Sequence, residues 1–474
     1  MSSSINFILN NEIIKTSINP ATVVLDFLRK NKKLTGTKEG CREGDCGACA
    51  ILLGQIVNGK IKYKTVNSCL LPVLAVNGKH IVTIEGLNSD KLNSIQQAIV
   101  DEGATQCGFC TPGFIISLTN FFLSNESLDK ETAMEFLSGN ICRCTGYASI
   151  KRTVEKLIKE LKPYSLIIPL TTEQLISEGI LPQYFKNIPA MLEKLEYGML
   201  MERIYSDSEY LIGGGTDLFV QKPNKLLSSN LTLTNRDKIF SEIKVENEFI
   251  KIGAAVTISE LQSSEIIKKH LPELEKQLTL FGSTPIRNRA TVGGNIINAS
   301  PIGDMTNILL ALNATLHISS NDDERSLSLK NFYLGYKKLD KKENEELLYI
   351  SIPLPGSNYK FNFEKVSRRT YLDIASVNSS IYIEINENII QRIRMSAGGI
   401  APYPFYLENT CNYLQSKEIN FNTVDEAASI AISEVSPISD VRGSADYKRI
   451  LLRQLILAHF IKLFPALIDV EEMI

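Results

Sequence analysis

Four cysteines near the start of the chain have a spacing that could hold two iron ions. Cys41, Cys46 and Cys49 lie in the stretch CREGDCGAC, and Cys69 follows further along. A C-x4-C-x2-C run with a distant fourth cysteine is typical of the thiolates that bind a [2Fe–2S] cluster. A structural zinc site and unrelated buried cysteines are the alternatives, although zinc usually takes its cysteines as two short pairs. The spacing therefore predicts an iron–sulfur cluster, whose chemistry is one-electron transfer.

Glycines between these cysteines should let the loop turn tightly enough to bring its thiols together. Gly40, Gly44 and Gly47 can adopt positive φ angles and let backbone amides approach the inorganic sulfurs of a cluster. Hydrogen bonds of that kind raise the reduction potential. The interleaved glycines thus fit an iron–sulfur cluster better than they fit zinc.

A second set of four cysteines follows in two pairs. Cys107 and Cys110 lie in QCGFC, and Cys142 and Cys144 lie in ICRCTGY. Both pairs fall at the ends of predicted helices, where loops from two helix pairs can meet and present four thiolates. A C-x2-C pair with a C-x-C pair also suits zinc. Because a first cluster is already predicted, a second cluster that completes an electron relay is the simpler interpretation.

Two glycine-rich stretches further along the chain could bind an anionic nucleotide. In EYLIGGGTDL, glycines 213–215 can crowd backbone amides around a pyrophosphate. The turn is not G-x-G-x-x-G, so a Rossmann site is disfavoured. In ATVGGNIINASPIGD, Thr291, Asn295 and Asp304 could hydrogen-bond phosphate or ribitol hydroxyl groups. A plain loop for the first stretch, and a buried, satisfied Asn–Asp network for the second, are the alternatives.

Composition narrows the class of protein. The chain has 474 residues, 44% of them hydrophobic, a net charge of −2 and a pI near 6.2. This length predicts about three or four globular domains. A slightly negative net charge gives no positively charged surface for nucleic acid, so we expect no nucleic-acid partner. Since neither a signal peptide nor a run of about eighteen apolar residues is visible, we expect a cytoplasmic protein with no membrane partner.

The remaining cysteine and the histidines suggest no further site. Eight of the nine cysteines precede residue 145, and in a chain of this size we expect them to be reduced, metal-binding thiolates. Cys411 stands apart and should pack as a small apolar residue. The four histidines are in no ligand spacing and are expected to be structural. They are His80, His270, His317 and His459.

The elements that must position the first cysteines form a small β-rich unit. Alternating apolar residues predict a β-hairpin over 5–18, and helical spacing predicts a helix over 22–30. An apolar strand follows Cys49 and a polar strand precedes Cys69. The fourth ligand should therefore arrive from across a small sheet.

Helices should position the second set of cysteines. We expect a helix over 92–100, one that accepts Pro112 in its first turn, a short one that ends at Gly139, and one that Ser149 caps. Prolines and a glycine interrupt short apolar pieces over 163–182, which predicts a linker.

The rest of the chain alternates helices and strands. Residues 190–200 predict a helix, and the residues before the glycine turn predict a strand. From residue 361 onward the sequence predicts two alternating strands, a helix over 423–434 and a long amphipathic helix near the C-terminus.

In this order, the cysteine motifs resemble the two-cluster iron–sulfur half of the molybdenum hydroxylases, the xanthine dehydrogenase family. The resemblance covers residues 1 to about 160 and holds at each of the eight cysteines. It implies two [2Fe–2S] clusters, of which the one in the helical domain lies nearer the molybdenum cofactor. It also implies that Gln106 approaches the pterin of that cofactor, although an ordinary polar residue at a loop end is the alternative.

The stretches LIGGGTDL and TVGGNIINASPIGD resemble the FAD domain of the same family, a two-loop flavin fold shared with vanillyl-alcohol-oxidase-type flavoproteins. The resemblance implies that residues 211–218 wrap the pyrophosphate and that Phe281 lies against the flavin or adenine. Leu347 could instead be strand core, and Lys365 a surface charge. The implied FAD contacts are Leu211, Ile212, Gly213, Gly214, Gly215, Thr216, Asp217, Leu218, Phe281, Thr291, Asn295, Asp304, Leu347 and Lys365.

The resemblance implies a multidomain α+β fold. A β-grasp, plant-type ferredoxin domain would occupy residues 1–80 and an all-helical [2Fe–2S] domain residues 81–162. After the linker at 163–182, a two-loop FAD-binding domain of the PCMH or vanillyl-alcohol-oxidase type would span 183–360. A small α+β flavoprotein C-terminal domain, similar to that of carbon monoxide dehydrogenase, would span 361–474.

The order cluster, cluster, flavin implies an electron relay. Substrate oxidation releases two electrons at once, each cluster carries one, and a flavin can collect two and pass on a hydride equivalent. The large molybdopterin-binding unit of the family is absent here, so we expect a separate large subunit, a heterotetramer, and NAD as the acceptor. No residue of this chain is then expected to be catalytic. The fusion favours a xanthine-oxidising enzyme of purine catabolism, which converts hypoxanthine and xanthine to urate.

Three other interpretations stay open. The same relay could serve an aldehyde or heterocycle hydroxylase, or the chain could be a non-enzymatic electron carrier. It could also be a zinc-containing scaffold whose cysteines only stabilise the fold. Oxygen could replace NAD as the final acceptor.

Overall fold

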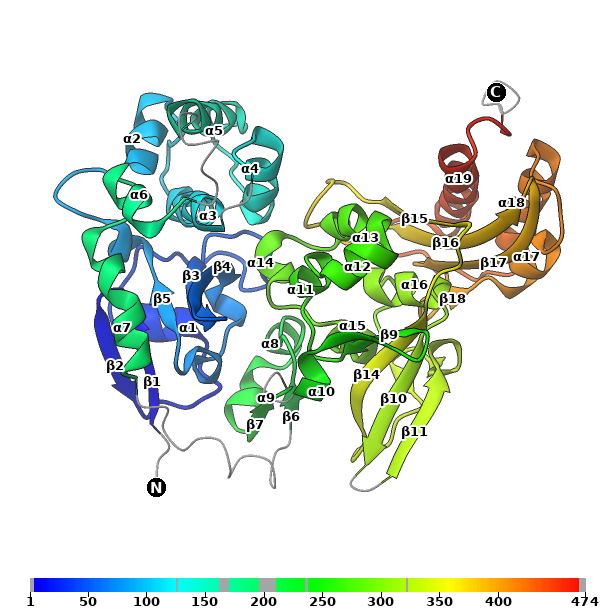
Figure 1. Cartoon of the computed structure of the whole chain (residues 1–474), viewed down its shortest axis with the longest axis horizontal. Coiled ribbons are helices and arrows are strands. Elements are labelled where there is room, and N and C mark those ends of the chain that lie inside the picture. The colour runs from blue at the N-terminus through cyan, green and yellow to red at the C-terminus, as the bar shows by residue number, and fades with distance from the viewer. Residues whose placement is uncertain are drawn as a thin grey trace. The chain divides into compact units, whose positions relative to one another are not determined.

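The computed structural model describes residues 4–124, 127–161, 170–195, 210–234, 238–320 and 323–468. The chain divides into two compact units. The first comprises Met1–Leu233 with Ser283–Arg289, and the second comprises Thr234–Gly282 with Ala290–Ile474. Each unit is built around sheets and helices of its own (Figure 1).

A five-stranded mixed sheet begins the first unit, with strand order β2-β1-β5-β3-β4. Strands β1 and β5 run parallel, and the other neighbours run antiparallel. The predicted hairpin is confirmed, because Ile8 pairs with Ile13 across β1 and β2. The strands are β1 (Ile5–Leu9), β2 (Glu12–Thr16), β3 (Ala50–Val57), β4 (Lys60–Asn67) and β5 (His80–Val82).

The helix predicted over 22–30 is short and changes its winding. An α-helical turn, α1 (Val24–Asp26), continues as a π-helical turn over Phe27–Asn31. Its apolar side chains, among them Leu25 and Leu28, are buried in one core with the inner face of the sheet. Burial of this apolar face explains why such a short helix is stable.

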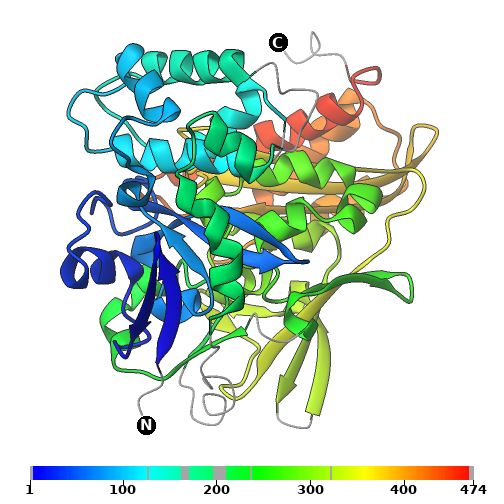
Figure 2. The ribbon, with the colours of Figure 1, turned by 60° about the vertical axis from the view of Figure 1, so that its left-hand side comes forward.

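Four helices form the next part of the first unit, and both ribbon views show them as a bundle (Figures 1 and 2). The central helix α3 is buried over most of its length, and Pro112 lies in its first turn as predicted. The prediction that Ser149 caps the last helix is wrong, because that helix begins one residue earlier and buries Ser149. The helices are α2 (Ser94–Asp101), α3 (Thr111–Ser124), α4 (Lys130–Phe136) and α5 (Ala148–Leu161).

The stretch predicted as a linker is ordered where the structure describes it. Residues 163–169 lie outside the described residues, but α6 (Thr172–Ser177) follows them. Thr171 and Gln174 form a capping box at its start, and Leu175 is buried in the core of the helix bundle. This part of 163–182 therefore packs as a structural element and does not act as a simple connection.

After a 3₁₀ turn, α7 (Ile188–Glu193) ends earlier than the predicted helix over 190–200, and residues 196–209 lie outside the described part. A parallel pair then forms from β6 (Tyr210–Ile212) and β7 (Leu231–Leu233), connected through α8 (Leu218–Gln221) and α9 (Pro223–Leu227). Their apolar side chains join the core of the first sheet. This packing fixes the start of the glycine-rich turn that follows β6.

A short helix from a distant part of the sequence, α14 (Thr284–Arg287), also belongs to the first unit. Arg287 is 1% exposed and forms a 2.6 Å ion pair with Glu135 of α4. The side-chain amide of Asn288 donates to the carbonyl of Thr65 in β4 at 2.8 Å. Helix α14 thus contacts both the helix bundle and the first sheet.

The second unit contains a five-stranded sheet with order β11-β10-β14-β9-β8, and all its neighbouring strands are antiparallel. Its strands are β8 (Ile243–Glu246), β9 (Phe249–Gly253), β10 (Thr315–Ser320), β11 (Asp323–Ser328) and β14 (Glu346–Pro353). A two-stranded ribbon pairs β12 (Tyr333–Gly335) with β13 (Lys338–Leu339). The helices of this part are α10 (Lys238–Ser241), α11 (Ile258–Gln262), α12 (Glu265–His270), α13 (Pro272–Gln277), α15 (Val292–Asn298) and α16 (Asp304–Ala311).

The C-terminal part of the second unit is an antiparallel meander covered by helices (Figure 1). The two predicted strands are confirmed as β16 (Val377–Asn386) and β17 (Ile389–Gly398). They lie between β15 (Tyr359–Val366) and β18 (Phe405–Tyr406). The helices are α17 (Glu408–Leu414), α18 (Phe421–Ser433) and α19 (Ala445–Leu463).

Helix α19 packs across β15 and β16 and buries polar as well as apolar side chains. Lys448 and His459 are both buried, so the helix is less sharply amphipathic than predicted. Cys411 is buried in the same core, which confirms its predicted apolar role. Among the helices that the structure describes, none is long and apolar enough to cross a membrane.

Candidate iron–sulfur and flavin sites

The register of the first sheet brings the first four cysteines together. Cys49 directly precedes β3, and Ala50 pairs with Asn67 at the end of β4, so Cys69 arrives beside Cys49. Their sulfur atoms are 3.3 Å apart. The fourth cysteine thus reaches the loop from the neighbouring strand, as the sequence predicts.

The other two thiols of this loop form a second pair. The amide of Cys41 donates to the sulfur of Cys46 at 3.5 Å, and the amide of Glu43 donates to the sulfur of Cys41 at 3.4 Å. Gly44 and Gly47 have φ angles of 83° and 66°, a region that a glycine enters without strain. The predicted role of these two glycines in the turn is therefore confirmed.

Each thiol pair favours one thiolate. A hydrogen bond from the Cys46 thiol lowers the pKa of Cys41 to about 5, and one from the Cys69 thiol lowers the pKa of Cys49. The donating partners, Cys46 and Cys69, have raised pKa values because they keep their protons against a neighbouring thiolate. Iron bound to such a pair would replace the remaining proton, since metal ligation requires deprotonated cysteine.

The second set of cysteines is also arranged as two pairs. The sulfur atoms of Cys107 and Cys144 are 3.6 Å apart. Cys110 shares a hydrogen bond with Cys142, and burial raises the pKa of Cys110 to about 12. Burial opposes ionisation of Cys142 as well, but the hydroxyl and the amide of Thr145 together lower its pKa. The loop that leads into α3 supplies Cys107 and Cys110, and the loop before α5 supplies Cys142 and Cys144, as predicted.

These donor sets fit [2Fe–2S] clusters. In such a cluster each of the two irons takes two of the four protein ligands. The eight predicted cysteines provide two pairs in each loop region, which is the arrangement that a two-iron centre needs. Within the described ranges, no three His, Cys, Asp or Glu side chains are grouped as ligands of a single metal ion.

The two cysteine loops contact each other directly, which the sequence did not reveal. The amide of Ile141 donates to the carbonyl of Cys46 at 3.1 Å, and the side chain of Asn140 donates to the carbonyl of Gly47 at 3.3 Å. A Cβ atom added at Gly47 would lie 2.2 Å from the carbonyl oxygen of Gly139. Only glycine permits this approach, because a larger residue would push the loops apart.

The first glycine-rich turn lies in the first unit, at the end of β6. Gly215 has a φ of 76°, and the guanidinium of Arg289 donates to the carbonyl of Gly214 at 2.6 Å. Burial lowers the pKa of Arg289 to about 10, and its Nε has no hydrogen-bond partner among the described residues. A cation beside this turn suits an anionic ligand. Sequence reasoning missed Arg289, because its partner is distant in the chain.

The second glycine-rich stretch, in the second unit, forms the start of a helix, which the sequence did not reveal. Thr291 is the N-cap of α15, and its hydroxyl accepts from the amide of Gly294 at 3.0 Å. A Cβ atom at Gly293 would lie 2.7 Å from the backbone oxygen of Ala254, so close packing explains this glycine. Asn295 lies in the same helix and accepts from the amide of Thr306 at 3.1 Å.

Asp304 and Lys365 form a buried ion pair in the second unit. Lys365 Nζ lies 2.7 Å from Asp304 Oδ2, and the two side chains are only 3% and 11% exposed. The other oxygen of Asp304 accepts from Asn378 at 2.6 Å. Lys365 also donates to the carbonyl of Leu280 at 2.9 Å, directly before the buried Phe281. Lys365 is therefore buried, and the alternative that it is a surface charge is wrong.

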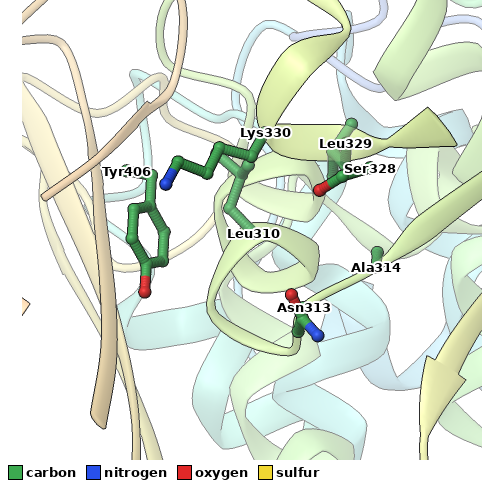
Figure 3. A pocket seen from close by; sticks show the side chains of 7 residues that line it. All are labelled: Leu310, Asn313, Ala314, Ser328, Leu329, Lys330 and Tyr406. Carbon is green, nitrogen blue, oxygen red and sulfur yellow. The ribbon is translucent and has the colours of Figure 1, made fainter. Parts of the chain in front are cut away.

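Leu347, the last predicted contact, is buried in β14 and pairs with Ile318 of β10. One pocket lies elsewhere in the second unit (Figure 3). It holds about 110 Å³, and Lys330 reaches across it toward the ring of Tyr406, 4.6 Å from the ring centre. None of the predicted flavin contacts lines this pocket.

Four domain families match the chain in succession. They are a 2Fe-2S iron-sulfur cluster binding domain (7–73), a [2Fe-2S] binding domain (83–155), an FAD binding domain in molybdopterin dehydrogenase (188–355) and a CO dehydrogenase flavoprotein C-terminal domain (362–463). This succession is the architecture of the iron–sulfur and flavin part of the molybdenum hydroxylases. It confirms the predicted multidomain α+β fold class, with two iron–sulfur domains and one FAD-binding domain.

Curated relatives are longer proteins. The chain is 29% identical to xanthine dehydrogenase 1 of Arabidopsis thaliana, over 93% of this chain and 38% of that protein. It is 26% identical to xanthine dehydrogenase/oxidase of Gallus gallus, over 94% and 39%. It is 24% identical to the aldehyde oxidase of Homo sapiens, over 94% and 38%. The chain thus spans about two-fifths of the length of these relatives.

Two solved structures are also similar. One is carbon monoxide dehydrogenase from Hydrogenophaga pseudoflava that lacks the Mo-pyranopterin moiety, with a TM-score of 0.50, 27% identity and coverage of 52% of this chain and 86% of that chain. The other is quinoline 2-oxidoreductase from Pseudomonas putida 86, with a TM-score of 0.50, 25% identity and coverage of 53% and 88%. These similar proteins differ in the substrates that their names state.

Proposed function

We propose that this chain is the electron-transfer subunit of a molybdenum hydroxylase. The observation that carries the proposal is the pairing of all eight predicted cysteines in two adjoining loop regions, followed in the chain by the flavin-domain motifs. Two [2Fe–2S] clusters would supply one-electron transfer, and FAD would convert single electrons into a two-electron product. We propose the domain boundaries expected from the sequence, except that the described part of 163–182 packs against the helical domain and is not a linker.

The residues of this chain hold the cofactors and do not react with substrate. Cys41, Cys46, Cys49 and Cys69 hold one cluster, and Cys107, Cys110, Cys142 and Cys144 hold the other. The residues predicted from the two flavin motifs bind FAD, and Arg289 adds a positive charge beside the first glycine turn. The contact between Ile141 and Cys46 keeps the two cluster loops at a fixed separation.

We further propose that the partner is a large molybdopterin-binding subunit and that the complete enzyme is a xanthine dehydrogenase. Support comes from relatives of that name, which match 93% and 94% of this chain, and from the order of the clusters and flavin on one polypeptide. Hydroxylation of the substrate with an oxygen atom from water would release two electrons and two protons. NAD⁺ takes up both electrons and one proton as hydride, and the second proton is released. A heterotetramer of two small and two large subunits is the proposed assembly.

The test is anaerobic addition of NADH to the purified chain. If the relay ends at a flavin that exchanges hydride with NAD, NADH should bleach the visible absorbance of flavin and clusters together. The Cys46→Ser variant is the matched control, because it should keep the flavin response and lose part of the cluster response. No bleaching by NADH in a chain that dithionite does reduce would refute NAD as the acceptor.

An aldehyde or heterocycle hydroxylase with the same relay is the second candidate. Similarity to aldehyde oxidase and to quinoline 2-oxidoreductase favours it. Copurification from native lysate separates the candidates, because the recovered molybdenum-containing chain can be assayed with xanthine, aldehydes and quinoline. Turnover of xanthine alone would support the first candidate, and turnover of the other substrates without xanthine would support the second.

A further inference from the structure

The hydroxyl of Thr145 lies against a cysteine sulfur of the second set. Thr145 Oγ1 is 3.2 Å from Cys142 Sγ, and the amide of the same threonine is 3.5 Å from that sulfur. In the first set, the sulfur atoms of Cys41 and Cys46 receive backbone amides at 3.4 and 3.5 Å. The Thr145 hydroxyl is thus closer to its sulfur than any of these amides.

A ring of hydrogen bonds orients this hydroxyl. The amide of Tyr147 donates to Thr145 Oγ1 at 3.3 Å, so the oxygen lone pair is used and the hydroxyl proton is left to point at Cys142 Sγ. The phenol oxygen of Tyr147 accepts from the amide of Cys142 at 3.0 Å, which closes the ring. Tyr147 itself has a φ of 67°, an uncommon conformation for a residue with a side chain.

The electrostatic consequence depends on the oxidation state of the site. Reduction of a [2Fe–2S] cluster adds one negative charge, which spreads onto the cysteine sulfurs. A hydrogen bond from a fixed donor is stronger when its acceptor carries more charge. A hydroxyl held at Cys142 Sγ therefore stabilises the reduced state more than the oxidised state, and hydrogen bonds to sulfur are one determinant of cluster potential.

We infer that Thr145 is a positioning residue that raises the reduction potential of the cluster held by Cys107, Cys110, Cys142 and Cys144. The inference rests on the proposed function, because it requires that a cluster is bound there. It assigns Thr145 the task of making this cluster easier to reduce than it would be with amide donors alone. Tyr147 acts through Thr145 by holding the hydroxyl in place.

The test is an anaerobic redox titration of the full chain, followed by low-temperature EPR of the two clusters. Thr145→Val keeps the shape and removes the hydroxyl, so the midpoint potential of one cluster should fall while the other stays constant. Thr145→Ser should retain the potential of the natural protein. Thr105→Val is the matched control, since the Thr105 hydroxyl pairs with Thr111 at 2.8 Å and forms no hydrogen bond to sulfur among the described residues.

An unchanged potential in Thr145→Val would overturn the inference, and so would an equal fall in Thr145→Ser, because then the methyl packing would matter and not the hydroxyl. If Thr145→Val fails to retain iron, a second experiment takes its place. ENDOR after deuterium exchange is then recorded for the natural protein and for Thr145→Ala. ENDOR must then show an exchangeable proton coupled to the reduced cluster that Thr145→Ala lacks. Absence of iron from the natural protein would refute the proposed function, whereas an iron-replete variant with unchanged potential refutes only the role of Thr145.

Discussion

Replacing Asp304 by alanine should destabilise the second unit and, by its proposed role in FAD binding, lower the FAD content of the chain. The carboxylate pairs with Lys365 at 2.7 Å and accepts from Asn378 at 2.6 Å, and the Lys365 side chain is only 3% exposed. Removal of one partner leaves a buried ammonium group whose remaining partner is the carbonyl of Leu280. Loss of one member of a buried pair costs about 3–5 kcal/mol.

The assay is hydrogen exchange of the amides in β15 and β16, which reports opening of this sheet directly. Asp304→Ala should lower the opening free energy by about 3–5 kcal/mol. Asp304→Leu combined with Lys365→Met should recover most of the loss, because it removes both charges. Glu408→Ala is the matched control, since it breaks the exposed ion pair of Glu408 with Lys330 at 2.9 Å and should cost at most about 1 kcal/mol.

Two results would contradict this reasoning. A loss no larger than that of the control would mean that the Asp304–Lys365 pair is effectively solvated. Loss of iron together with flavin would mean that Asp304 supports the whole fold, because the proposed role predicts a lower FAD content with cluster absorbance intact.

Three further predictions concern other parts of the chain. Cys46→Ser should remove one cluster and leave FAD and the second cluster in place, whereas Cys411→Ser should change neither; equal iron loss in both variants would refute the ligand assignment. Gly47→Ala should lower iron content, because the new Cβ would lie 2.2 Å from a backbone oxygen, whereas Gly59 has a similar positive φ with open space around it, so Gly59→Ala should not lower it. Burial lowers the pKa of His459 to about 4. Below about pH 6.5 the unfolded chain therefore binds a proton at this histidine that the folded chain does not bind. Stability should therefore fall by about 1.4 kcal/mol per pH unit below pH 6.5 and level off near pH 4. His459→Gln should flatten that slope in melting curves recorded against pH, and an unaltered slope would contradict the assignment.

The cysteine sites could be predicted because local spacing determines most of their geometry. Cys41, Cys46 and Cys49 lie in one loop, and β3 and β4 need only pair in register to deliver Cys69. Positive φ could also be anticipated at Gly44 and Gly47, because a short loop with three ligands must turn sharply, but Gly40 does not adopt it.

The flavin motifs were harder to predict, because residues far apart in the chain determine their structure. No helix was predicted at Thr291, and two glycines weaken a helix, but the threonine N-cap and close packing of Gly293 against Ala254 stabilise one there. Lys365 could not be distinguished from a surface lysine without its distant partner Asp304.

Long-range contacts account for the other features that the sequence did not predict. The ion pair of Arg287 with Glu135 joins segments that no local pattern relates. The helix inside the predicted linker did carry a readable signal, because Thr171 and Gln174 have capping-box spacing. The neighbouring prolines, Pro169 and Pro182, interrupt the apolar pattern and obscure that signal.

The most direct test of the electron-relay proposal is the cofactor content of the purified chain, measured as iron, acid-labile sulfide and flavin, with EPR after reduction by dithionite. The account predicts about four iron atoms, about four sulfides and one FAD per chain, with two distinct [2Fe–2S] signals. Zinc in place of iron, with neither sulfide nor flavin, would contradict it.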